Sequence, residues 1–516
     1  MPAFNFVRKS FYRDSVTLMR LSSELEAVAG VSAAAALMGT PHNRELLAQA
    51  GLLADAGAAA EPTDLIIAVA ADSRGSAEAA RAAAERALLA PKPTTAGVAT
   101  ASPRTLASAL KLLADANLAL ISVPGAYAAA EAFKALDAGL HVMLFSDNVP
   151  VETEISCKRR ALERSLLMLG PDCGTAILDG VPLGFANAVP RGRIGLAAAS
   201  GTGLQEVTCA LARESEGVSQ AIGVGGRDLS DEVGGTMMLR ALQLLAADPA
   251  TEVICVIGKL PGVATAHRIA DALTKIAKPR VACFPGASVA TTASPDLERV
   301  MARLTDVGVH VAATLEDAGR AAVALARGRK PVPTEFTLPH AEVERLVGDA
   351  ARGLAPGQRY VRGVYSGGTL AFEALAVLGQ SLDDVPRSLT GGGAGHRVVD
   401  LGDDAFTLGR PHPMIDGRVR RDWIDKEGRD PATAVLLLDV VLGYGAHPDP
   451  VGELLPAIRT VRAQRPLPVV ASVCGTDADP QSRAAQVERL HAAGVIVMGG
   501  NAQAARLAAA IARRAR

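Results

Sequence analysis

The sequence predicts an α/β protein built from doubly wound parallel sheets. Short aliphatic runs alternate with helix-like stretches along the 516 residues, and turn residues such as glycine, proline and aspartate separate them. Apolar residues make up 49% of the chain and aromatic residues only 3%, a balance typical of the central strands of parallel sheets. One motif also occurs twice: a strand-like run leads through a Ser/Gly/Thr loop into a helix-like stretch at residues 194–207 and again at 360–373.

We expect three regions. The first, residues 1–189, has expected strands at 64–70, 118–123, 141–145 and 165–169. Pro190-Arg191-Gly192 marks the start of the second region, 190–328, and a basic, proline-bearing linker follows at 329–356. The third region, 357–516, repeats the second, because the expected strands 252–258 and 280–286 have counterparts at 433–439 and 468–475.

Composition excludes several classes of protein. The net charge of −1 provides no basic field for nucleic acid or an anionic membrane. The N-terminus has no apolar signal core, and no run of about 18 apolar residues is present to span a membrane. The six cysteines show no CxxC spacing, which disfavours disulfide frameworks and zinc sites. We therefore expect a cytoplasmic protein.

The repeated loops are candidate anion sites. Unpaired backbone N–H groups at the start of a helix, together with the helix dipole, favour a phosphate or carboxylate. The residues expected to bind phosphate or substrate in this way are Ser200, Gly201, Thr202, Gly203, Ser366, Gly367, Gly368 and Thr369. The alternative is that each loop is an ordinary helix start capped by serine or threonine.

Other candidates lie where expected strands end. Gly225 and Gly226 form a hinge beside Arg227, whose guanidinium is suited to clamp an anion, or pairs locally with Asp228 or Asp231. Asp439 and Gly443 follow a strand of the third region and are also assigned to the substrate site. Lys259 is similarly placed in the second region, where phosphate neutralisation and simple solvation are equally good interpretations.

A charged stretch in the third region supplies the proton-transfer candidates. Several carboxylates, a guanidinium and an imidazole lie within it, namely Asp400, Asp403, Asp404, Arg410 and His412. These groups are suited to holding a substrate and moving a proton. Mg²⁺ binding by the aspartates and a purely structural histidine are the alternatives, and we assign no metal ligand.

The chain resembles a known enzyme family through several of these motifs. Gly170-Pro171-Asp172-Cys173, Ser200-Gly201-Thr202 and Gly223–Asp228 are similar to the alpha subunit of succinyl-CoA synthetase, and the third region is similar to the carboxyl-terminal ligase domain of its beta subunit. The stretches 145–149, 401–404 and 409–416 resemble the FdrA proteins, described as acyl-CoA synthetase relatives. The resemblance implies a Rossmann-like CoA-binding-type domain followed by two flavodoxin-like domains that pack face to face. It assigns Pro124, Asp172 and Cys173 to a CoA-type loop.

Two departures from the synthetase are informative. Its phosphate-carrying histidine follows a strand that corresponds to residues 280–284, but no histidine occurs here between His267 and His310. The ATP-grasp domain of the beta subunit has no counterpart, because the 329–356 linker is too short to hold one. We therefore expect a reaction that requires no nucleotide or other cofactor, with CoA and Mg²⁺ as optional ligands.

The FdrA resemblance implies carbamoyl transfer in allantoin breakdown, in which oxalurate and phosphate give oxamate and carbamoyl phosphate. Arg227, Arg410, His412, Asp403 and Asp404 are the expected catalytic residues. The expected partners are small-molecule substrates and further enzyme subunits, in a homo- or hetero-oligomer. The alternatives are an acyl-CoA ligase that uses an ATP-grasp subunit in trans, and a non-catalytic subunit that binds CoA or a small acid.

Overall fold

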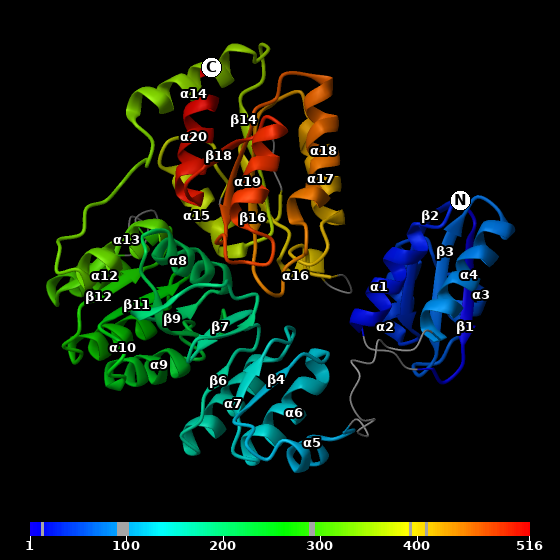
Figure 1. Ribbon diagram of the computed structural model, residues 1–516, viewed down its shortest axis with the longest axis horizontal. Coiled ribbons are helices and arrows are strands. Elements are labelled where there is room, and N and C mark those ends of the chain that lie inside the picture. The colour runs from blue at the N-terminus through cyan, green and yellow to red at the C-terminus, as the bar shows by residue number, and fades with distance from the viewer. Residues whose placement is uncertain are drawn as a thin grey trace. The chain divides into compact units, whose positions relative to one another are not determined.

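A computed structural model describes residues 1–11, 15–89, 103–287, 295–386, 388–391, 395–407 and 411–515. One compact unit lies within residues 1–102, and a second lies within 103–407 and 412–516 (Figure 1). None of the described helices is long and apolar enough to cross a membrane.

The first unit is an antiparallel sheet with helices, and it corrects one prediction. The run 64–70 was expected to belong to the parallel sheet of a domain spanning 1–189, but as β3 it pairs antiparallel with strands on both sides, in the order β1-β3-β2. Every residue of β3 is buried, because apolar clusters cover both faces of the sheet. The elements are β1 (Ala3–Arg8), α1 (Ser15–Glu26), β2 (Val31–Met38), α2 (Pro41–Gln49), α3 (Asp55–Ala58), β3 (Leu65–Ala71) and α4 (Arg74–Leu89).

The second unit begins with a small parallel sheet of order β4-β5-β6. It contains the remaining strands that were expected in the first region, and their carboxyl ends lead into the loops at 122–124, 145–150 and 170–174. Its elements are α5 (Leu106–Leu112), β4 (Leu118–Ile121), α6 (Gly125–Asp137), β5 (His141–Leu144), α7 (Val151–Glu163) and β6 (Met168–Leu169).

A seven-stranded sheet of order β13-β12-β11-β9-β10-β7-β8 follows. Its five parallel strands are β9 to β13, and the hairpin β7–β8 adds antiparallel to β10, so residues 175–184 lie in this sheet although the sequence placed them before the boundary at 190. The elements are β7 (Thr175–Leu178), β8 (Val181–Gly184), β9 (Arg191–Ala199), α8 (Gly201–Arg213), β10 (Val218–Gly223), α9 (Thr236–Ala247), β11 (Val253–Gly258), α10 (Val263–Thr274), β12 (Arg280–Cys283), α12 (Pro295–Asp306), β13 (Val309–Ala312) and α13 (Leu315–Ala326).

The last sheet has the order β15-β14-β16-β17-β18 and is wholly parallel. Numbered within each sheet, β9–β13 and β14–β18 share the order 2-1-3-4-5 of flavodoxin-like folds, which confirms the predicted repeat. The elements are α14 (His340–Arg352), β14 (Tyr360–Tyr365), α15 (Gly368–Gly379), β15 (Arg397–Asp400), α16 (Asp404–Thr407), α17 (Arg418–Arg429), β16 (Thr433–Val441), α18 (Pro450–Gln464), β17 (Val469–Cys474), α19 (Arg483–Ala492), β18 (Ile496–Met498) and α20 (Asn501–Arg514).

The two repeated sheets pack against each other through equivalent helices. Helix α8 contacts α15 and helix α13 contacts α20, and apolar residues from both halves form one continuous core cluster. Buried polar groups add specific contacts across this interface. The Asn187 amide donates to Asp479 Oδ2 at 2.8 Å, and the Gln205 amide donates to the Leu442 carbonyl at 3.0 Å. The packing brings the carboxyl ends of β9 and β14 together.

Candidate active site

The two repeated loops meet directly. Ser200 caps α8 by accepting a hydrogen bond from the Gly203 N–H at 2.9 Å, and its hydroxyl donates to Thr369 Oγ1 on α15 at 2.6 Å. Both side chains are buried. The N–H groups of Gly201 and Thr202 are the first two of α8 and have no acceptor within the helix. The start of α8 therefore keeps the anion-binding potential that the sequence predicts.

The loop of the third region is different, because the protein fills it with its own carboxylate. Asp439 accepts hydrogen bonds from the Ser366 N–H at 2.9 Å, the Ser366 hydroxyl at 3.1 Å and the Gly367 N–H at 2.8 Å. Arg420, from α17, donates to Asp439 Oδ1 at 2.9 Å. Ser366 and Gly367, which were predicted to bind an external anion, therefore bind the Asp439 carboxylate instead. Asp439, which was predicted to bind substrate, is engaged by these two residues.

Gly443 also has a packing role where the sequence predicted substrate binding. Its φ is +134°, and a Cβ at this position would lie 2.3 Å from the Phe185 carbonyl oxygen. The next residue, Tyr444, donates its N–H to the Ala186 carbonyl at 3.1 Å. Glycine is needed here because two backbones approach closely at the interface of the halves.

Arg227 is held by a partner that the sequence analysis did not identify. Its guanidinium donates to Glu154 Oε2 at 3.0 Å and to the Val149 carbonyl at 2.6 Å, rather than to Asp228 or Asp231. Its side chain stays 47% exposed. Arg227 thus borders the site from a fixed position.

A buried network of ion pairs fixes Glu154, the residue that holds Arg227. Lys158 Nζ lies 2.7 Å from Glu154 Oε1 and 2.7 Å from Asp228 Oδ1, and all three side chains are at most 1% exposed. Asp228 also accepts the N–H groups of Met237 and Met238 at the start of α9. The i, i+4 spacing of Glu154 and Lys158 on a helix is the only sequence signal for this network.

The Gly225–Gly226 turn packs on the Gly-Pro-Asp-Cys loop. Gly225 has φ +91°, and a Cβ there would lie 2.6 Å from the Pro171 carbonyl oxygen. A Cβ at Gly226 would be 3.6 Å from Asp172 Oδ2, which places that carboxylate beside the turn. Two of the three motifs that carry the resemblance to the synthetase alpha subunit are therefore in contact.

In the CoA-type loop, Pro124 and Asp172 are exposed and Cys173 is buried. Surrounding protein atoms nevertheless raise the pKa of the Asp172 carboxyl to about 6, with Asp147 and Asp404 as further causes. Cys173 is buried, its thiol donates to the Gly223 carbonyl at 3.4 Å, and burial raises its pKa to about 12, so it is not a nucleophile. Pro124 precedes α6 as its N-cap residue.

Carboxylates dominate the rest of the site. Burial raises the pKa of Asp400 to about 6, and the pKa of Asp404 is also raised, by burial and by Asp147 and Asp403. Lys259 is exposed, and its positive charge lowers the pKa values of both Asp172 and Asp400. Negatively charged side chains thus outnumber positively charged ones around the site.

His412, one of the residues predicted to move a proton, has one ring nitrogen engaged by the backbone. Its Nδ1 accepts the Met414 N–H at 3.2 Å, and burial together with Arg420 lowers the pKa of the imidazole to about 4. The ring is therefore neutral at pH 7, and its proton resides on Nε2. Its ring centroid lies 5.7 Å from that of Phe185.

Some predictions fall elsewhere. Arg410 lies outside the described residues, so its catalytic role stays a prediction. No group of three or more described His, Cys, Asp or Glu side chains is arranged to hold a metal ion.

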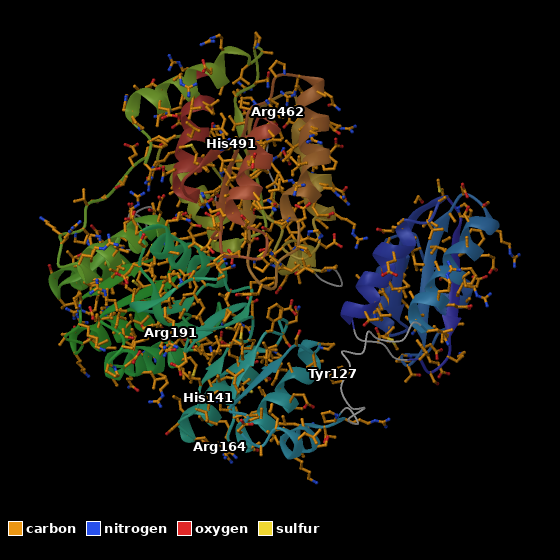
Figure 2. All side chains as sticks on the ribbon, in the orientation of Figure 1. Tyr127, His141, Arg164, Arg191, Arg462 and His491 are labelled. Carbon is orange, nitrogen blue, oxygen red and sulfur yellow. The ribbon has the colours of Figure 1, made fainter. Side chains whose placement is uncertain are left out.

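Figure 2 labels two further histidines, His141 on β5 and His491 on α19. His141 is structural, because its Nδ1 accepts the Leu167 N–H at 2.9 Å.

Comparison with known proteins places the chain in a family. The family described as CoA-ligase matches residues 364–511, and the family described as AllF, heavy metal-associated domain, matches residues 1–104. The uncharacterized protein YahF of Escherichia coli strain K12 is 38% identical over 97% of this chain and 97% of its own length. The chain belongs to the YahF family. Its members' FdrA/AllF-type, succinyl-CoA-synthetase-like character agrees with the resemblance found in the sequence.

Other relatives of this YahF-family chain match in part. The SauD subunit of the ADP-forming sulfoacetate-CoA ligase of Bilophila wadsworthia is 32% identical, over 33% of this chain and 60% of its own length. The alpha 1 subunit of Archaeoglobus fulgidus succinate–CoA ligase is 27% identical, over 39% of this chain and 74% of its own length. A solved acetyl-coenzyme A synthetase 1 from Ca. Korarchaeum cryptofilum aligns with a TM-score of 0.35 and 17% identity, over 78% of this chain and 83% of its own.

The N-terminal domain of this YahF-family chain does not fit a heavy-metal site. Soft metal ions prefer thiolate and imidazole ligands, but residues 1–104 contain no cysteine and a single histidine, His42. After β1 the chain continues with Lys9, whose ammonium lies 3.1 Å from the buried Asp64 carboxylate, and Ser10, whose N–H donates to the same group at 2.9 Å. No metal therefore enters the function proposed below.

Proposed function

We propose that this YahF-family chain transfers a carbamoyl or related acyl group between phosphate and a small carboxylic acid amide, without ATP and without CoA. The reaction it fits best is the conversion of oxalurate and phosphate to oxamate and carbamoyl phosphate. The start of α8, with Gly201 and Thr202, binds the phosphate or the substrate carboxylate, and Arg227 stabilises the charge that develops in the transition state.

The observation that carries this proposal is that the chain keeps a loop suited to bind phosphate but lacks the histidine that carries phosphate in the synthetase. The start of α8 has N–H groups without an acceptor in the helix and is joined to α15 by the Ser200–Thr369 hydrogen bond, yet the sequence between His267 and His310 contains no histidine to carry phosphate. A phosphate-binding loop without a phosphate-carrying side chain suits phosphate as a co-substrate. The AllF-type N-terminal domain is consistent with this assignment.

The charge of the site supports independence from CoA. CoA carries a diphosphate, and the Gly-Pro-Asp-Cys loop presents Asp172 with Asp147 and Asp404 near enough to raise its pKa. Lys259 and Arg227 oppose this charge, but the three carboxylates outnumber the two cations, which disfavours a polyanion at this position. A small substrate with one carboxylate avoids most of this repulsion.

A second candidate is an acyl-CoA ligase that borrows an ATP-grasp subunit. The observation in its favour is the CoA-ligase family match over residues 364–511, together with the partial similarity to subunits of two ADP-forming CoA ligases. The missing histidine counts against it, because the ligase would then need another route for phosphate.

The test is phosphorolysis by the purified full chain, alone and with the proteins of neighbouring genes. Oxalurate and phosphate are supplied without nucleotide or CoA, and carbamoyl phosphate is detected by coupling to carbamate kinase and ADP. Formation of carbamoyl phosphate supports the transferase. If only CoA-dependent ATP turnover with an ATP-grasp subunit is found, the ligase replaces it.

A backbone variant makes this test specific. Gly201→Pro deletes one N–H from the start of α8, and proline is tolerated at the first helical position. Ser200 already has an extended conformation, with φ −165° and ψ 114°, as a residue before proline requires. We expect a rise of about tenfold in KM for phosphate. Val263→Pro, at the first position of α10, is the matched control and should leave KM unchanged.

A further inference from the structure

Asp400 places an unused carboxylate oxygen beside the start of α15. The residue ends β15 and is 5% exposed, and its Oδ1 accepts the Gly402 N–H at 2.9 Å. A Cβ at Gly368 would lie 2.6 Å from Oδ2, so this oxygen faces the helix start. Among the residues that the structure describes, none donates a hydrogen bond to Oδ2.

His412 places a hydrogen-bond donor near the same carboxylate, beside Gly402. Because its Nδ1 accepts the Met414 N–H and the ring is neutral, Nε2 carries the proton. A Cβ at Gly402 would lie 2.7 Å from this Nε2 and 3.2 Å from Asp400 Oδ1, so the donor and the carboxylate border one glycine. No described residue accepts a hydrogen bond from Nε2.

A primary amide matches this arrangement. Its NH₂ group donates and its carbonyl oxygen accepts, side by side in one plane, whereas a carboxylate only accepts. We propose that Asp400 and the Nε2–H of His412 together recognise the amide or ureide end of the substrate, so that the site selects an amide over a second carboxylate. This inference rests on the proposed function for the class of substrate, and it changes the role of His412 from proton transfer to recognition.

The charges around the pair favour the same selection. Asp400 is close enough to Asp403 and Asp439 for their charges to raise its pKa, with Lys259 as the opposing cation, and His412 faces the cation Arg420. Arg420 is already committed to Asp439 at 2.9 Å. A second carboxylate placed at Asp400 would therefore meet three negative groups and one exposed lysine.

The experiment compares three small ligands on the full chain at pH 7.5, of which oxamate and oxalate are nearly equal in size. Oxamate carries one carboxylate and one amide, oxalate carries two carboxylates, and N,N-dimethyloxamate lacks both N–H donors. Isothermal titration calorimetry should show oxamate binding at least about tenfold more tightly than either of the others. This comparison uses the unaltered protein and so depends on no variant folding.

A variant pair then assigns the preference to one residue. Asp400→Asn replaces an acceptor by a group that also donates, so the preference for oxamate over oxalate should disappear or reverse. Asp422→Asn removes an exposed carboxylate of α17 that is not part of the site, and it is the control that should keep the preference.

Each outcome decides a different claim. Equal affinity for oxamate and oxalate, no binding of oxamate, or an unchanged preference in Asp400→Asn overturns the amide-recognition inference. If oxamate is preferred as expected but the phosphorolysis assay gives no carbamoyl phosphate, amide recognition stands and the proposed transferase fails. If carbamoyl phosphate forms but oxamate is not preferred over oxalate, the transferase stands and amide recognition fails.

Discussion

Replacing Asp439 by alanine should destabilise the third region and make it responsive to small carboxylates. The Asp439 side chain is fully buried and accepts three hydrogen bonds from Ser366 and Gly367, while the Arg420 side chain that pairs with it is only 4% exposed. In Asp439→Ala the guanidinium stays buried without its partner. Breaking a buried pair in this way costs about 3–5 kcal/mol.

The assay is thermal unfolding followed by calorimetry, with and without formate. A loss of about 4 kcal/mol corresponds to a fall of roughly 10 °C in the midpoint for a region of this size. Formate is a carboxylate small enough to occupy the vacated cradle of N–H groups, so 100 mM formate, about an order of magnitude above a weak Kd, should restore part of the loss through binding to the folded state.

Two controls make the result interpretable. Sodium chloride at the same ionic strength should restore little, and Asp422→Ala, at an exposed position of α17, should change stability by no more than about 0.5 kcal/mol. The reasoning is refuted if Asp439→Ala loses less than about 1 kcal/mol, or if formate and chloride act equally.

Three further predictions follow from buried groups. Burial raises the pKa of Glu373 from its ordinary 4.5 to about 7, so the protonated carboxyl stabilises the fold at low pH. This contribution, up to about 3 kcal/mol, is lost as the pH rises from 4.5 through 7, and Glu373→Gln should flatten the pH dependence of the unfolding free energy in this range. All six cysteines are buried and should react with a thiol reagent at pH 8 only after urea is added, and labelling of the native protein would contradict the packing. Gly443→Ala should destabilise by several kcal/mol in a urea titration because φ is +134° and a backbone oxygen would lie 2.3 Å away, whereas Gly348→Ala, in α14 with nothing within 4 Å, should stabilise by about 0.5–1 kcal/mol.

The sequence predicted the two repeated sheets well, because their signals are local. A strand that runs through a Ser/Gly/Thr loop into a helix can be recognised within about 15 residues, and both examples are in the structure at β9–α8 and β14–α15. The error at β3 has the same origin. A continuous apolar run shows that a strand is buried on both faces, but it does not show whether its neighbours are parallel or antiparallel.

The site was predicted less completely because its partners are distant in the chain. Arg227 pairs with Glu154, 73 residues away, and Ser366 binds Asp439, also 73 residues away. No short pattern encodes such pairs. The sequence therefore identified the charged groups at strand ends but not that one of them, Asp439, neutralises a loop that would otherwise bind an anion.

The segment between α13 and α14 joins the two repeated sheets and is itself anchored to both. The Thr334 N–H donates to Asp317 Oδ1 at 3.1 Å, and the Thr337 N–H donates to Gln503 Oε1 on α20 at 2.9 Å. In a two-subunit enzyme, halves of this kind find each other by diffusion, and dilution separates them. A short tether holds them at an effective concentration in the millimolar range at any protein concentration. The contact between Ser200 and Thr369 is therefore not needed to hold the two halves together, and its geometry can evolve to serve the chemistry of the site.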